Sequence, residues 1–162
     1  MDKDKEINKC STMKYLANKR WIASFALMLI FTSCESYLIN GDLDGFWQVQ
    51  EIEWLETGDV VQCNNEAFYA FQRHIVQLTQ YPSTHVMGQM STRYHASFDW
   101  QGDSISLGDF REYDLDGSKK KTSLSELRKF GLCQEYTTFH ILLSKESLTL
   151  TSDSTRISLR KY

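Results

Sequence analysis

The stretch RYHASFDW, residues 93–100, alternates between polar and apolar side chains over its whole length. Successive side chains of a β-strand point to opposite faces, so Tyr94, Ala96, Phe98 and Trp100 share one face. The other face carries only polar and charged residues. This pattern predicts a strand with one face in a hydrophobic core and the other in water, as in antiparallel sheets.

Further extended segments, separated by short turns, lie on both sides of this stretch. Together the predicted strands are residues 46–56, 60–63, 73–80, 93–100, 104–110, 135–143, 147–151 and 155–161. Residues 64–72 are expected to form a helical turn, and residues 114–122 a polar loop. Short strands at such regular spacing predict an all-β sandwich or barrel. An eight-stranded antiparallel up-and-down barrel is the expected architecture, because closure removes exposed sheet edges.

One short helix is expected late in the chain, in the stretch SLSELRKFGL at residues 123–132. Ser123 and Glu126 have the spacing of a capping box, and Gly131 is well placed as the C-terminal stop. The chain contains a single proline and no long glycine or serine tract that would mark a linker. Residues 45–162 are therefore expected to form one domain.

The N-terminal residues have the pattern of an export signal. Residues 21–31 carry no charge, and the basic residues Lys19 and Arg20 precede them. This apolar run is too short to span a bilayer, which needs about 20 residues, but it matches the core of a secretory signal. Residues 1–33 are expected to be a leader and signal peptide, with Met13 as the start of the compact signal. A buried N-terminal helix is the alternative.

The signal ends in FTSC, residues 31–34, which resembles the lipobox of bacterial lipoproteins, although Phe31 stands where an aliphatic residue is usual. The resemblance implies that Cys34 is acylated and that residues 34–44 hold the lipid and a tether. Several acyl chains anchor a protein stably, whereas one binds only marginally. The expected location is the outer membrane of the cell envelope, with the domain in the periplasm or at the cell surface.

The segment DLDGFWQVQEI, residues 42–52, resembles the Gly-x-Trp opening strand of lipocalins. With YPSTH, the helical stretch and the closing ISLRKY, it makes the mature region similar to the lipocalin-like lipoproteins of Gram-negative bacteria. The resemblance implies a lipocalin-like barrel in which Trp47 seals the closed end and a basic residue of the last strand, Arg156 or Arg160, lies across it. A core tryptophan without a cationic partner is the alternative.

The region after Cys34 is acidic, with 18 Asp or Glu against 12 Lys or Arg. Nucleic-acid binding draws its affinity from clustered cationic side chains on phosphates, so nucleic acid is not an expected partner. The one basic run, residues 119–121, follows an Asp-rich turn and is interpreted as part of a solvated loop.

Two cysteines remain once the leader is removed and Cys34 is acylated. Cys63 and Cys133 form an even pair in an oxidising compartment, where disulfides persist. A bridge would close a loop of roughly 70 residues and contribute about 4 kcal/mol in the chain-entropy model. Two buried free thiols are the alternative.

The sequence lacks the common catalytic motifs, including the nucleophile elbow, the zinc-protease helix motif and the phosphate-binding loop. Its four histidines have no spacing that indicates a shared metal, and no metal or cofactor is expected. His74 is predicted to face inward with Val76 and Leu78, where a buried, hydrogen-bonded histidine is the commoner explanation. An enzyme using His74 with a neighbouring acid is therefore the least favoured hypothesis.

Aromatic residues fall on many of the predicted inward faces, which is typical of small-ligand sites. The candidate cavity residues are Trp54, Phe68, Phe71, His74, Tyr94, Phe98, Trp100 and Phe139. A barrel of this size can also be packed solid by the same side chains. The leading hypothesis is a non-catalytic, lipid-anchored protein that binds a small apolar or amphipathic molecule. The alternative is an interaction module with a filled barrel that binds an envelope protein partner.

Overall fold

The computed structural model describes residues 39–82, 91–113 and 119–162. The chain divides into two compact units, residues 1–37 and 38–162, and every described residue belongs to the second. The predicted export signal, Cys34 and residues 35–38 of the predicted tether lie outside the described residues, whereas residues 39–44 of that tether are described and belong to the second unit. No helix among the described residues is long and apolar enough to cross a membrane.

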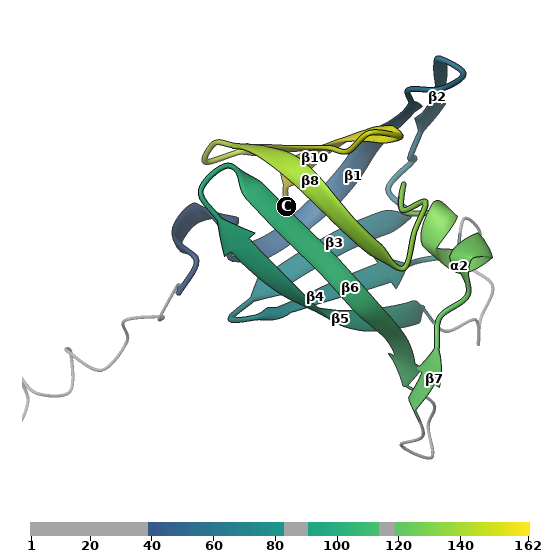
Figure 1. The fold of residues 1–162 in the computed structure, drawn as a ribbon, viewed down its shortest axis with the longest axis horizontal. Coiled ribbons are helices and arrows are strands. Elements are labelled where there is room, and N and C mark those ends of the chain that lie inside the picture. Colours follow the sequence, from purple (N-terminus) through teal and green to yellow (C-terminus); the bar gives the residue numbers. More distant parts are fainter. Residues whose placement is uncertain (1–38, 83–90, 114–118) are drawn as a thin grey trace, which may run out of the picture. The chain divides into compact units, whose positions relative to one another are not determined.

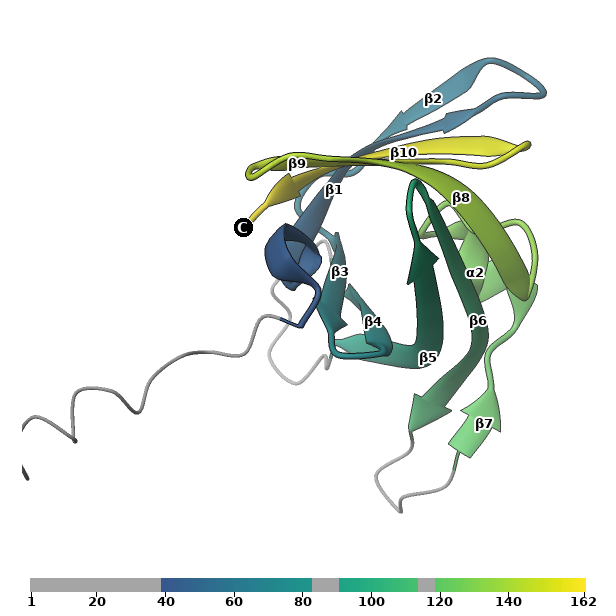
Figure 2. The ribbon, with the colours of Figure 1, turned by 60° about the vertical axis from the view of Figure 1, so that its left-hand side comes forward.

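Eight antiparallel strands close into a barrel, as predicted (Figures 1 and 2). Around the barrel these strands are β1 (Gly45–Trp54), β3 (Ala67–Gln72), β4 (Ile75–Gln80), β5 (Thr92–Gln101), β6 (Ser104–Tyr113), β8 (Tyr136–Leu143), β9 (Ser147–Thr151) and β10 (Thr155–Lys161). The last strand pairs with the first from Trp47–Lys161 to Trp54–Thr155, which closes the sheet. The barrel order follows the chain order, so the topology is up-and-down.

Two short strands extend the barrel wall. Strand β2 (Asp59–Gln62) pairs with the second half of β1, while the first half of β1 pairs with β3. The β1–β2 hairpin consequently extends away from the barrel (Figure 2). Strand β7 (Lys119–Lys121) pairs with the end of β6, which corrects the prediction of a loop there. The helical turn predicted over 64–72 is also wrong, because residues 67–72 form β3.

The barrel interior is one apolar core. The face of residues 93–100 that is predicted to be apolar points into this core. Tyr94, Ala96 and Phe98 are buried, and Trp100, nearer the end of β5, is half-buried. The other strands bury their inward residues in the same cluster. Burial of this apolar surface stabilises the fold by roughly 25 cal/mol per Å².

The 3-10 helix η1 (Gly41–Leu43) closes one end of the barrel, and α2 lies at the opposite end (Figure 1). Leu43 and Trp47 are both completely buried. The indole N–H of Trp47 donates to the Leu43 carbonyl across 2.8 Å, so the largest side chain of the core also holds η1 in place. A buried indole usually needs such a partner for its N–H.

The other end of the barrel is filled by the plug segment, residues 123–132, which contains α2 (Leu124–Arg128). Ser123 is the N-cap, and its hydroxyl accepts from the backbone N–H of Glu126 at 3.4 Å, as the capping-box spacing predicts. Leu127, Phe130 and Leu132 project from the plug segment into the core and are buried. One short helix at this position was expected, and the structure confirms it.

Side chains of the barrel wall hold the plug segment by its polar groups. The Tyr69 hydroxyl donates to the Phe130 carbonyl at 2.7 Å, and the Thr155 hydroxyl donates to the Gly131 carbonyl at 2.8 Å. Both bonds are buried, where leaving a carbonyl unpaired costs about 1–3 kcal/mol. The Tyr94 hydroxyl donates to Glu126 at 2.9 Å. The plug segment is therefore bonded to the wall as well as packed against it.

Candidate functional site

The predicted cavity residues do not all gather around one cavity, although His74, Phe98 and Trp100 line the same concavity at one end of the barrel. Phe71, Tyr94, Phe98 and Phe139 pack in the common core. The ring centroids of Phe71 and Phe98 lie 5.4 Å apart, and those of Tyr94 and Phe130 lie 6.0 Å apart. These are contact separations for aromatic rings, so the side chains fill the space between the strands. Of the two alternatives for the interior, these packed residues fit the filled core.

The remaining predicted residues lie in three different places. Phe68 points out of the barrel, because its neighbours on β3 point in. Trp54 stands at the end closed by the plug segment, and Trp100 lines a concavity at the opposite end. His74 corrects the prediction of an inward histidine: β4 begins at residue 75, and His74 is exposed in the turn before it.

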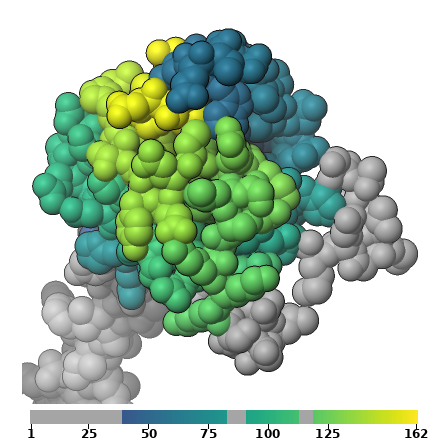
Figure 3. Space-filling view, turned by 45° about the vertical axis from the view of Figure 1, so that its right-hand side comes forward, coloured from purple at the N-terminus to yellow at the C-terminus, as the bar shows by residue number. Residues whose placement is uncertain are grey.

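A concavity of about 430 Å³ lies at the mouth of the barrel, outside the plug segment. It is lined by Trp54, Glu56, Thr57, Asp59, Arg128, Cys133, Gln134 and Ser154. The β1–β2 hairpin supplies one side, α2 and the start of the following loop supply another, and the β9–β10 turn supplies the third. Figure 3 views the molecule from the side on which the hairpin (blue) lies above the plug segment (green). We call this concavity the mouth site.

The mouth site combines an indole with a cation. The guanidinium carbon of Arg128 lies 5.3 Å from the centroid of the Trp54 ring, within the range of a cation–π interaction. Trp54 is only half-buried, so part of its ring remains accessible. Glu56 and Asp59 add carboxylates on the hairpin side. The lining is mostly polar, and Trp54 supplies its main apolar surface, so the site is more polar than the usual small-ligand site.

The two cysteines are free thiols in the structure, which has the unbridged form of the two alternatives. Cys63 follows β2 and packs against the core, where its backbone N–H donates to the Gln50 carbonyl at 2.9 Å. Burial raises the pKa of the Cys63 thiol, and the nearby Glu66 carboxylate raises it further. Cys133 instead lines the mouth site. Each thiol thus has a separate environment.

The closed end contains the expected cation over Trp47, but from a different residue. The Lys161 ammonium lies 4.6 Å from the Trp47 ring centroid and donates to the carbonyls of Asp42 and Asp44. Trp47 and Lys161 are register partners and share a face of the sheet. Arg160 pairs with the outward-facing residue 48 and so points away, which corrects its assignment. The other candidate, Arg156, forms an outward ion pair with a glutamate of β1.

A second concavity, of about 540 Å³, lies on the outer wall of β1, β3 and β10, and we call it the outer groove. It is lined by Phe46, Gln48, Asn64, Asn65, Glu66, Phe68, Tyr81, Pro82, Arg160 and Tyr162. Of these residues, only Phe68 and Arg160 are predicted from the sequence to belong to a site, and both are predicted for other sites. Phe46 and Phe68 are large apolar residues at outward positions of their strands. This pattern could have indicated the groove.

The groups that hold the plug segment have shifted pKa values. Burial raises the pKa of Tyr69 far above its usual range. The pKa of Tyr94 is raised by burial and by its hydrogen bond to Glu126. Hydrogen bonds from Lys129 and Tyr94 lower the pKa of Glu126. The tyrosines are therefore neutral donors and Glu126 is an anionic acceptor at neutral pH.

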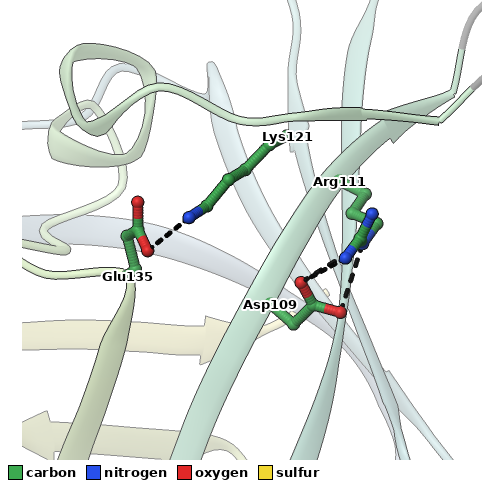
Figure 4. Close-up of polar contacts among 4 residues, drawn as sticks. All are labelled: Asp109, Arg111, Lys121 and Glu135. Atoms are coloured by element: carbon green, nitrogen blue, oxygen red, sulfur yellow. Dashed lines mark hydrogen bonds and ion pairs between the residues drawn. The ribbon is translucent and has the colours of Figure 1, made fainter.

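Ion pairs lie on the outer surface of β6 and its neighbours (Figure 4). Asp109 accepts from the Arg111 guanidinium at 2.9 Å, and the Lys121 ammonium lies 2.7 Å from Glu135. Asp109 has a φ of 59°, at a bulge where the register between β5 and β6 shifts. Bulges of this kind re-aim side chains. These pairs are substantially exposed, so each contributes little to stability.

Comparisons with known proteins agree on the fold. The family model of the lipocalin-like domain matches residues 29–162. A lipocalin-like protein from Bacteroides uniformis ATCC 8492 is similar in structure, with a TM-score of 0.55 and 22% identity over 75% of this chain and 100% of that chain. An uncharacterised protein from Bacteroides eggerthii DSM 20697 has a TM-score of 0.55 and 19% identity over 74% and 99%. No curated protein matches this chain.

Proposed function

Since this chain belongs to the family of lipocalin-like domains, we propose that it is a non-catalytic, lipid-anchored envelope protein that binds a small amphipathic molecule at the mouth site. Lipocalin-like barrels are suited to small ligands, because eight strands enclose little more than one such molecule. Because the interior of this barrel is packed, the ligand is expected to contact the outside of the plug segment. The ligand would lie on the barrel mouth and not within it.

The observation that carries this proposal is the pairing of Trp54 with Arg128 in the mouth site. The exposed part of the indole supplies an apolar surface, and the guanidinium supplies hydrogen-bond donors at its edge. The volume of about 430 Å³ lies within the range of about 300–1,000 Å³ that is usual for small-molecule sites. Such a site fits a molecule with one apolar face and one polar group.

The proposed ligand can be detected by native mass spectrometry of the chain purified from cell envelopes. We expect an additional mass that is lost on denaturation. Trp54→Ala should weaken its retention about tenfold or more, because a buried aromatic contact is worth more than about 1 kcal/mol. Trp100→Ala removes the same side chain from the opposite end of the barrel and should leave the additional mass in place. A bare wild-type protein, or equal retention by both variants, contradicts the proposal.

The lipid anchor rests on the apolar run of residues 21–31 and the lipobox-like FTSC that ends in Cys34. Glu35 is the only acid directly after Cys34, which favours the periplasmic side of the outer membrane. Cells fed an alkyne-tagged fatty acid should incorporate the tag into the wild-type protein, and Cys34→Ala should abolish incorporation. Cys63→Ala is the matched control, since this residue lies within the domain and should not change labelling. Undiminished labelling of Cys34→Ala would rule out this anchor.

An interaction module remains the second candidate function, and the β1–β2 hairpin favours it. Val60 and Val61 are about half exposed on β2, which pairs on one side with β1. Exposed apolar residues on an edge strand are a common docking surface for another protein. The same mass spectrum separates the two functions, because a bare protein favours the interaction module with an envelope protein partner.

A further inference from the structure

We propose that the outer groove is a second binding site, distinct from the mouth site, and that it takes a neutral saccharide. The groove lies on the outer wall of β1, β3 and β10, away from the plug segment. Its floor and sides are aromatic, and its rim carries amides, one cation and one carboxylate. A sugar ring has the complementary construction, with apolar C–H faces and hydroxyl groups around its edge.

The aromatic rings form a contiguous surface, which we call the platform, with Tyr81 and Tyr162 edge-on to Phe68. Phe68 is at its centre, with its ring centroid 5.2 Å from that of Phe46, 5.4 Å from that of Tyr81 and 5.5 Å from that of Tyr162. These separations are contact distances, so no space is left between the rings for a trimethylammonium group. The platform is therefore not an aromatic cage for a quaternary amine, which surrounds its cation with separated rings. Because Phe68 itself is nearly buried, a flat ligand face would lie on the exposed ring of Tyr162 at the edge of the platform.

A buried glutamine organises the polar rim. Gln48 points out of the barrel, between the inward-facing residues 47 and 49, yet only 1% of its surface is exposed. Its amide oxygen accepts from Arg160 at 3.1 Å and from Gln50 at 3.0 Å, and its amide nitrogen donates to Asn65. Side chains that are fixed by such bonds bind without losing much conformational freedom. Arg160 and Asn65 are thus positioned before a ligand arrives.

Hydrogen-bonding groups remain on this rim after the network is formed. Within the described parts of the chain, Arg160 donates only to Gln48, and the Glu66 carboxylate accepts no side-chain hydrogen bond. A guanidinium has five N–H donors and a carboxylate has several acceptor positions. The rim therefore offers donors and acceptors together, with formal charges that cancel. Hydroxyl groups, which both donate and accept, match this rim better than a phosphate or a carboxylate does.

The shape of the groove distinguishes a saccharide from a lipid surface. Tyrosine and phenylalanine also occur where proteins touch a membrane, but there they project from the surface. In this chain Phe68 is 5% exposed, and the tyrosines stand at its sides, so the aromatic surface is concave. A concave aromatic surface accommodates a ring-sized ligand and cannot reach into a flat bilayer.

Saturation-transfer NMR of the full chain in detergent tests this site with three probes: maltotriose, cellotriose and chitotriose. We expect transfer to at least one of them, with a Kd of about 1 mM. Tyr162→Ala should weaken binding about fivefold or more, and Tyr162→Phe should retain most of it, because the ring face makes the contact. Tyr162 is 79% exposed at the end of the chain, so its removal should not disturb folding.

Two controls make the result specific. Tyr136→Ala removes another exposed tyrosine, from β8, and should leave saccharide binding unchanged. Trp54→Ala should also leave saccharide binding unchanged, because Trp54 lines the mouth site and not the outer groove. The mouth-site proposal and the outer-groove proposal can therefore fail independently. The proposal is overturned if no probe shows transfer, or if Tyr162→Ala binds as the wild type does. It is also overturned if Tyr162→Ala instead lowers the binding of phosphatidylethanolamine vesicles, which would assign the groove to a lipid surface.

Discussion

Replacing Gly131 with alanine is expected to lower the free energy of unfolding by about 3 kcal/mol. Gly131 has a φ of +84°, where an L-residue costs roughly 1–2 kcal/mol. An added Cβ would also lie 2.8 Å from Cγ1 of Ile157 and 3.3 Å from Cγ2 of Ile52. Both isoleucines are buried and cannot move freely, so overpacking adds about 1–3 kcal/mol. Thermal unfolding of the full chain should show a melting temperature lower by about 10 °C.

Gly58→Ala is the matched control for this substitution. Gly58 also has a positive φ, +74°, but nothing lies within 4 Å of the added Cβ. The free energy of unfolding of this variant should fall only by the cost of the positive φ, about 1–2 kcal/mol. The difference between the two variants isolates the contact of the plug segment with the barrel wall. Equal losses would mean that Gly131 does not pack against Ile52 and Ile157 as described.

Phe130→Ala is expected to cost about 3–5 kcal/mol, because it deletes a fully buried aromatic ring and leaves a cavity. The ring of Phe130 packs against Tyr69 and Tyr94, with centroids 6.3 Å and 6.0 Å away. Its backbone carbonyl would still accept from the Tyr69 hydroxyl, so the plug segment should stay in place. The cavity would then be enclosed and apolar, and such cavities stay dry and bind benzene.

A thermal melt with and without benzene measures this second effect. Benzene should raise the melting temperature of Phe130→Ala and leave that of the wild-type protein unchanged, since only a ligand that binds the folded state stabilises it. Leu124→Ala, at an exposed position of α2, should fall within about 0.5 kcal/mol of the wild type. A wild-type protein that responds equally to benzene would show that its interior is already open.

The fold could be predicted from the sequence because the alternation of side chains survives in the strands. The pattern of residues 93–100 and the range 155–161 correspond to β5 and β10, and the capping box and Gly131 mark the plug segment. The helical turn over 64–72 was wrong because its tyrosine and phenylalanines form a strand only through pairing with β1 and β4. Long-range pairing of this kind is not visible in a local pattern.

The site was harder to predict. An inward-facing position in a strand does not show whether an aromatic ring is packed in the core or lines a cavity. Phe71 and Phe139 have the pattern of ligand-contacting residues, yet they fill the core. The assignment of Arg160 was wrong by one residue, because the next residue, Lys161, faces Trp47 on the other face of the strand. The outer groove was missed because a buried Gln48 on the outer wall depends on neighbours from the loop before β3 and from β10.

The pairing of β1 with β10 places the two ends of the domain side by side. The backbone N–H of Tyr162 donates to the Phe46 carbonyl at 2.9 Å, next to the Trp47–Lys161 pair. A short peptide could join these ends, and a new start could be opened in the β1–β2 turn near Gly58, where nothing lies within 4 Å of an added Cβ. Circular permutation would then retain the closed barrel while moving the chain ends to the opposite end of the barrel. If the protein is anchored through its N-terminal region as we propose, permutation would reverse its orientation on the membrane without redesigning its core.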